Sequence, residues 1–174
     1  MARYRRYRRR RINKKKWEPN LIKFNNEGFA FLTGNGYNST VLCTCPIRDS
    51  ANGINRTYTI KRPTFAFEME ANIQETWQYL ENICFYIMFL PQGYSPKYSL
   101  PQEHPEWIMS KQFYGSAATD FGEAFSKSIP KKITSRLART LHSGDQIIFL
   151  ITYSNTSELS IEGHLSGMLD FYSK

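Results

Sequence analysis

Short hydrophobic runs separated by turn-forming residues recur along most of the chain, a pattern typical of β-strands. The clearest run is 56–70, where apolar residues first fall at even positions, as at Tyr58 and Ile60, and then at odd ones, as at Phe65. This parity changes across Pro63, which has no N–H to give to a strand ladder. We therefore expect a bulge or an edge position there.

Three further segments show strong strand patterns. Residues 83–90 are continuously apolar, as expected of a strand that is covered on both faces. Residues 146–153 follow the turn 143–145 and contain five consecutive apolar residues. Residues 160–172 alternate, and this places apolar and polar side chains on opposite faces.

The remaining segments give weaker signals. Residues 21–32 predict a first strand that is interrupted near 25–28, and 38–46 predict a second. Residues 107–114 fit a strand or a short helix, and 131–141 fit a strand or a helical face. The tract 91–105 contains four prolines and predicts a long loop. Roughly eight strand-like runs with few helices indicate an all-β sandwich or barrel.

Charge divides the chain into two parts. The first sixteen residues hold seven arginines, three lysines and no carboxylate. The whole chain has 23 basic and 15 acidic residues, so 13 basic and 15 acidic residues remain from Trp17 onward, a charge of −2. The sequence thus predicts a polycationic arm, residues 1–17, attached to a nearly neutral body, residues 18–174.

The arm has the chemistry of a nucleic-acid-binding segment. Arginine forks pair with phosphate oxygens, and the interleaved aromatic rings suit stacking on unpaired bases. The predicted contact residues are Arg3, Tyr4, Arg5, Arg6, Tyr7, Arg8, Arg9, Arg10, Arg11, Lys14, Lys15, Lys16 and Trp17. Ten cations in a row repel one another, so we expect a disordered arm when unbound. The same run fits a nuclear import signal, whereas membrane binding is disfavoured because the arm lacks an apolar face.

Size and cysteine content limit the other possibilities. The body has the size of one domain, and its aromatic content exceeds what one small core needs, so we expect some aromatic side chains at protein contacts. The longest apolar run, eight residues, is too short to cross a membrane. Cys43, Cys45 and Cys84 are an odd number without paired spacing, which indicates a reducing compartment and no disulfide framework.

No motif points to catalysis, a metal or a cofactor. The sequence contains no nucleophile elbow, no phosphate-binding glycine loop before a helix and no close-paired metal ligands. We therefore expect no enzyme activity and no cofactor. A second basic set lies in the body, and solvated charges explain it about as well as nucleic-acid contacts do. It comprises Lys61, Arg62, Lys131, Lys132, Arg136 and Arg139.

The layout resembles the capsid proteins of circular single-stranded DNA viruses of the circovirus-like group. The resemblance rests on the arm, the strand 53–70, the segment 85–93, His104-Pro105-Glu106-Trp107 and Ser143-Gly144-Asp145 before a hydrophobic strand. It implies an eight-stranded jelly roll, a shell of about sixty copies with inward-pointing arms, and a virion protein that visits the host nucleus through import factors. The implied genome is single-stranded DNA, with RNA left open.

Two alternatives stand beside this interpretation. One is a non-assembling cellular nucleic-acid-binding β-domain, ribosomal or RNA-binding, although its body would then be expected to carry more basic residues. The other is a β-barrel enzyme with a targeting tail. If the chain is a shell protein, the neutral tract 91–105 is expected to make subunit contacts through Tyr94, Tyr98 and Leu100, because aromatic anchors dominate such interfaces.

Overall fold

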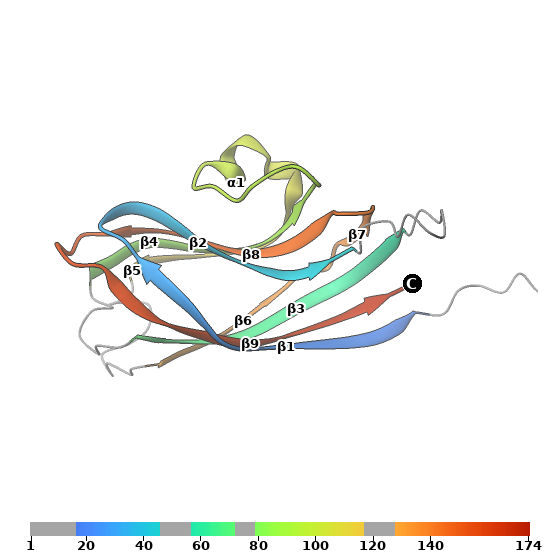
Figure 1. Cartoon of the computed structure of the whole chain (residues 1–174), viewed down its shortest axis with the longest axis horizontal. Coiled ribbons are helices and arrows are strands. Elements are labelled where there is room, and N and C mark those ends of the chain that lie inside the picture. Colours follow the sequence, from blue (N-terminus) through green and yellow to red (C-terminus); the bar gives the residue numbers. More distant parts are fainter. Residues whose placement is uncertain (1–16, 46–56, 72–78, 117–127) are drawn as a thin grey trace, which may run out of the picture.

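The chain folds into two antiparallel β-sheets that face each other (Figure 1). The computed structural model describes residues 17–45, 57–71, 79–116 and 128–174. The strands in these ranges are β1 (Glu18–Phe31), β2 (Gly34–Thr44), β3 (Tyr58–Ala71), β4 (Leu80–Leu90), β5 (Ile108–Ser116), β6 (Ser128–Thr134), β7 (Ala138–Leu141), β8 (Gln146–Asn155) and β9 (Ile161–Ser173). One sheet has the order β1-β9-β3-β6, with β7 also paired to β3, and the other has the order β2-β8-β4-β5. The prediction of an all-β sandwich is confirmed.

An aromatic core fills the space between the sheets. Phe65 and Phe67 of one sheet pack against Phe149 of the other, with ring centroids 4.8 and 4.7 Å apart. The expected alternation along 160–172 is confirmed, because β9 buries Leu165, Leu169 and Phe171 and exposes the polar residues between them. This period-two pattern gives the five-stranded sheet an inner apolar face and an outer polar face.

The bulge expected at Pro63 is present in β3. The register between β3 and β9 shifts between Lys61 and Thr64, and Arg62 adopts a positive φ of 53°. On the other side of β3, the main-chain oxygen of Pro63 accepts a hydrogen bond from Ser135 N–H at 2.9 Å. The ladder is interrupted here, so residues 135–137 separate β6 from β7. The ambiguous run 131–141 therefore forms parts of two strands with a short break between them, and the described residues contain nine strands rather than eight.

The tract 91–105 is more ordered than the expected loop. It contains α1 (Leu100–Glu103), and the 3₁₀ helix η2 (Pro105–Trp107) follows directly. Together they lie over the outer face of the four-stranded sheet (Figure 1). A second hydrophobic cluster forms beneath them from Met88, Leu90, Leu100, Ile148 and Leu150.

This second cluster explains two features of the sequence. It covers the outer face of β4, as its continuous apolar run 83–90 predicted, and that of β8. It also buries part of the hydrophobic and aromatic side chains that do not belong to the main core, since Tyr86 and Trp107 pack against it. Part of the aromatic excess that suggested protein contacts is thus used inside this chain.

The weaker predictions are resolved by strand pairing. Residues 107–114, which fitted a strand or a helix, lie mainly in β5, paired with β4. The interrupted first strand is the single strand β1, with a register shift between Phe24 and Glu27. Within the described ranges, no helix combines the length and apolar character needed to cross a membrane.

Candidate functional site

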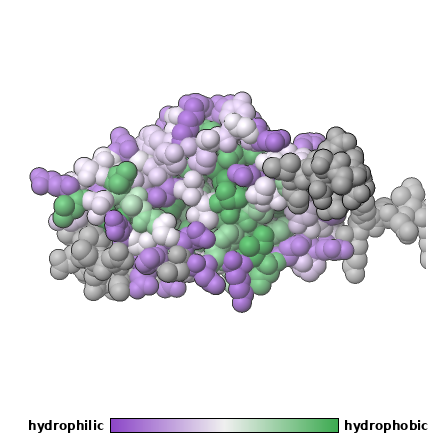
Figure 2. All heavy atoms as spheres, viewed as in Figure 1, coloured by the Kyte–Doolittle hydropathy of each residue, from purple (hydrophilic) through white to green (hydrophobic). Residues whose placement is uncertain are grey.

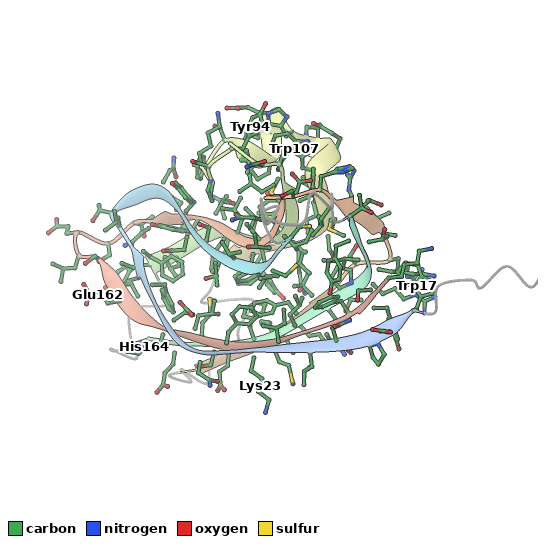
Figure 3. The ribbon with its side chains drawn as sticks, turned by 45° about the vertical axis from the view of Figure 1, so that its right-hand side comes forward. Trp17, Lys23, Tyr94, Trp107, Glu162 and His164 are labelled. Carbon is green, nitrogen blue, oxygen red and sulfur yellow. The ribbon has the colours of Figure 1, made fainter. Side chains whose placement is uncertain are left out.

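The predicted arm contacts lie outside the described residues, except Trp17. Residues 1–16 carry Arg3 to Lys16 of the predicted set, and their role stays a prediction. Trp17 is partly buried at the start of β1, at one end of the five-stranded sheet (Figure 3). Its ring centroid lies 4.6 Å from Lys174 Nζ and 5.4 Å from Lys61 Nζ, within the range of cation–π attraction.

The six basic residues of the body do not share one role. Lys61 contacts Trp17, whereas Lys131 Nζ lies 5.0 Å from the Tyr114 ring centroid. Arg139 donates a hydrogen bond to the main-chain oxygen of Glu106, and its guanidinium lies 5.6 Å from the Phe89 ring centroid. Arg139 thereby holds η2 against the sheet, which is a structural use of its charge.

The remaining three basic residues of that set are exposed. Arg62 lies at the bulge of β3, Lys132 lies on β6, and Arg136 lies in the short connection between β6 and β7. Lys132 faces the side of its strand opposite the buried Ile133. These three positions are therefore available to solvent and to a ligand alike.

The three predicted subunit-contact residues separate into two groups. Tyr94 and Tyr98 are exposed, with 52% and 40% of their surface accessible. Leu100 has 0% accessible surface and belongs to the second hydrophobic cluster, so the expectation that it contacts another subunit is corrected. Its position in the first turn of α1 points it down onto the sheet, where it holds α1 in place.

Tyr94 also contributes to a small aromatic stack above the four-stranded sheet. Its ring lies 4.8 Å from the Trp107 ring at an interplanar angle of 81°, and the His104 ring stacks on Trp107 at 3.7 Å. Figure 3 shows Tyr94 and Trp107 together at the top of the molecule. Glu106 accepts a hydrogen bond from His104 Nδ1 at 3.1 Å, or forms an ion pair with it when the imidazole is protonated. Tyr94 therefore packs partly within the chain. Of the two tyrosines, Tyr98 is the better candidate for a contact with another subunit.

Asp145 anchors the segment 91–107, which carries these aromatic rings, to the sandwich. The carboxylate is buried and accepts hydrogen bonds from the main-chain N–H of Gln92, at 3.0 Å, and of His142, at 2.8 Å. The main-chain oxygen of Asp145 accepts a third bond from the Cys45 N–H at 2.8 Å. The turn 143–145 that the sequence singled out therefore fixes where the 91–107 segment leaves the sheet.

An exposed apolar group that the sequence pattern did not reveal lies at the opposite end of the sandwich. Leu32 and Leu159 have 63% and 75% of their surface accessible, and Tyr79 has 41%. The side-chain amide of Asn155 joins the segments of Leu32 and Leu159, because it donates to the main-chain oxygens of Phe31 and Leu159. The Thr156 N–H donates to the main-chain oxygen of Tyr79. Figure 2 shows hydrophobic side chains at this left-hand end. These residues lie far apart in the sequence, before β2, before β4 and before β9, and only the tertiary fold brings their segments to the same end of the sandwich.

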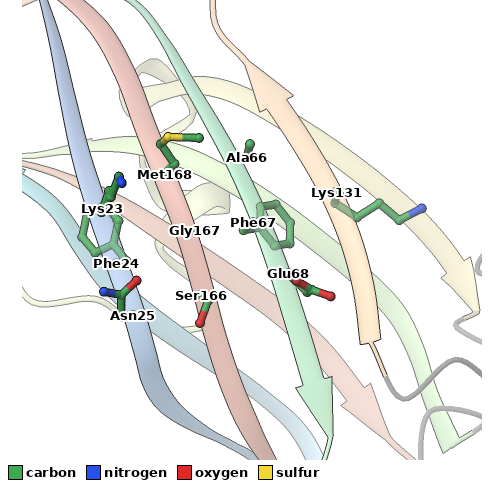
Figure 4. Close-up of a pocket in the computed structure, with 10 residues that line it drawn as sticks. All are labelled: Lys23, Phe24, Asn25, Ala66, Phe67, Glu68, Lys131, Ser166, Gly167 and Met168. Carbon is green, nitrogen blue, oxygen red and sulfur yellow. The ribbon is translucent and has the colours of Figure 1, made fainter.

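A shallow groove of about 410 Å³ lies on the outer face of the five-stranded sheet (Figure 4). It runs across β1, β9, β3 and β6 and is lined by both charged and apolar groups, among them Lys23, Glu68, Lys131 and Met168. Lys23 and Glu68 carry opposite charges on neighbouring parts of this surface. The groove is open and mixed in character, and it singles out no ligand.

Burial makes the cysteines poor nucleophiles. Desolvation raises the pKa of the Cys43 thiol to about 12, and burial also raises the pKa values of Cys45 and Cys84. A thiolate is the reactive form, so these side chains act as small hydrophobic residues at neutral pH. In the described part of the chain, no three histidine, cysteine or acidic side chains gather as metal ligands would.

Comparison with known proteins gives distant structural similarity only. No protein-family model and no curated protein matches the sequence. Two similar solved structures are those of the Gx and Gt strains of infectious bursal disease virus, at 10% and 9% identity, with TM-scores of 0.41 and 0.42. Each match covers 91% of this chain and 32% of the other, so this chain spans about a third of the length of those proteins.

Proposed function

We propose that this protein is a viral capsid subunit whose body forms the shell and whose arm binds the packaged nucleic acid. The observation that carries the proposal is the strand order, β1-β9-β3-β6 facing β2-β8-β4-β5. β6 and β7 pair with successive parts of β3, so they fill one position in the sheet. Two four-position sheets connected in this order support the proposal of a jelly roll, a fold used by viral shells, lectins and cupins.

A jelly roll alone does not determine function, so the proposal also rests on the charge of the arm. Ten positive charges precede a body whose net charge is −2. A body of low net charge suits close packing of many copies, because strongly charged subunits repel one another. The cationic arm in turn suits a polyanion enclosed by those copies. Together these features favour a structural role over a catalytic one.

The finer part of the proposal follows the resemblance to circovirus-like capsids. It assigns a single-stranded DNA genome, a shell of about sixty copies and passage through the host nucleus. Sixty arms of ten charges supply about 600 positive charges, a sizeable fraction of a genome of a few thousand phosphates. Tyr98, with Tyr94 beside it, is proposed to contact a neighbouring subunit.

Sedimentation and electron microscopy of the purified full chain, with and without single-stranded DNA, test this proposal. We expect closed particles that contain nucleic acid. A chain that stays monomeric with nucleic acid at every salt concentration would overturn it and favour the non-assembling nucleic-acid-binding domain.

The salt dependence of binding tests the arm. Replacing Arg8, Arg9, Arg10 and Arg11 with Gln should flatten the slope of log affinity against log salt concentration by about 3, at about 0.7 per lost contact.

A further inference from the structure

The outer face of the five-stranded sheet brings three residues from distant parts of the sequence together. Glu18 of β1 pairs with Ser173 of β9, so Trp17 comes opposite Lys174 where that ladder ends. Tyr172 of β9 pairs in turn with Lys61 of β3. Among the described elements, α1 and η2 lie over the other sheet and not over this end (Figure 1).

The two lysines concentrate positive charge around one indole ring. Lys174 Nζ and Lys61 Nζ lie 4.6 and 5.4 Å from the Trp17 ring centroid. The ion pairs of Lys97 with Glu103 and of His104 with Glu106, which lie within the described residues, do not involve Lys61 or Lys174. Each ammonium group is attracted to the face of the indole ring, whereas the two ammonium groups repel each other. An anion between them would remove that repulsion.

The two ends of this sheet face differ in the sign of their charges, with exposed Asp170 and Lys23 between them. Trp17, Lys61 and Lys174 lie at the end where the described chain begins. Exposed acidic side chains, Glu70 of β3 and Glu162 of β9, lie toward the other end. Figure 3 shows Trp17 and Glu162 at these opposite ends. A polyanion on this face is therefore attracted to the Trp17 end and repelled from the distal end.

We propose that Trp17, Lys61 and Lys174 form a binding site on the body for the phosphodiester backbone of single-stranded nucleic acid. A phosphate bridges the two ammonium groups beside the indole. The inference rests on the proposed packaging function, because the ten cations of residues 1–16 immediately precede Trp17 in the sequence. A strand bound by the arm continues onto the body at this point, and the acidic distal end limits how far it extends.

The salt dependence of binding tests this site in the full chain. Lys61→Gln with Lys174→Gln should lower the log–log slope for an oligothymidine by about 1.4, at about 0.7 for each lost contact. The matched control is Lys97→Gln with Lys111→Gln, which removes the same charge from exposed positions before α1 and on β5, away from this sheet. This control should leave the slope unchanged. Equal changes in both double variants would overturn the site in favour of diffuse attraction by the whole body.

Lysine acetylation read by mass spectrometry gives a second measurement that needs no variant. Bound oligothymidine should protect Lys61 and Lys174 several-fold and leave Lys111 reactive. Protection of Lys61 and Lys174 by anionic lipid vesicles and not by the oligothymidine would overturn the nucleic-acid assignment.

Failure of this inference is distinguishable from failure of the proposed function. If the variant with Arg8 to Arg11 replaced flattens the slope and the Lys61/Lys174 variant does not, the arm binds nucleic acid and the body site is refuted. If neither variant changes the slope, the proposed role of the arm fails as well.

Discussion

At the residue scale, Gly167 shows how tightly the aromatic core is packed. It pairs with Phe67 on one side and Phe24 on the other. A Cβ at this position would lie 2.9 Å from two ring atoms of Phe65 and 2.8 Å from the main-chain oxygen of Ala66. Gly167→Ala should therefore destabilise the fold by about 1–3 kcal/mol, because the close neighbours include main chain and a buried ring. Chemical denaturation measures the change.

Gly28 provides the matched control. It also lies in a strand of the same sheet, but a Cβ there would meet no atom within 4 Å. Gly28→Ala should shift the free energy of unfolding by less than about 0.5 kcal/mol. Equal destabilisation by both substitutions would contradict the packing argument at Gly167.

At the element scale, the segment 91–107 serves the fold and offers a surface at the same time. Leu100→Ala should lower the free energy of unfolding by about 2–5 kcal/mol, because it opens a cavity under α1.

Tyr98→Ala should leave the monomer's stability nearly unchanged and weaken particle formation, since an aromatic anchor at an interface is worth about 2 kcal/mol or more. Thermal melting and sedimentation separate the two effects. Particles of normal stability from the Tyr98 variant would place the subunit contacts elsewhere, with the exposed end at Leu32 and Leu159 as the next surface to test.

At the scale of the whole molecule, the body should fold without the arm. Both hydrophobic clusters of the described residues are built from buried residues between Phe24 and Phe171, and the ten cations of residues 1–16 repel one another. Deleting residues 1–16 should preserve the β circular-dichroism signal and shift the free energy of unfolding by less than about 1 kcal/mol, while abolishing most nucleic-acid binding. Loss of the β signal in the truncated chain would show that arm and body fold together.

The sequence by itself determined the local features of this protein. Alternation identified β9, the continuous apolar run identified a strand covered on both faces, and the parity change at Pro63 located the bulge in β3. These signals are local because side-chain direction in a strand repeats every two residues. The division of charge between arm and body is likewise a property of sequence alone.

Tertiary structure decided what depends on distant pairing. The order of the strands, the burial of Leu100 beneath α1, and the approach of Lys61 and Lys174 to Trp17 each join residues far apart in the chain. Leu100 and Tyr98 stand two positions apart in one neutral tract, yet one is buried and the other exposed. The local sequence does not predict this difference in burial. It arises because Leu100 packs on the outer face of the sheet formed by β4 and β8.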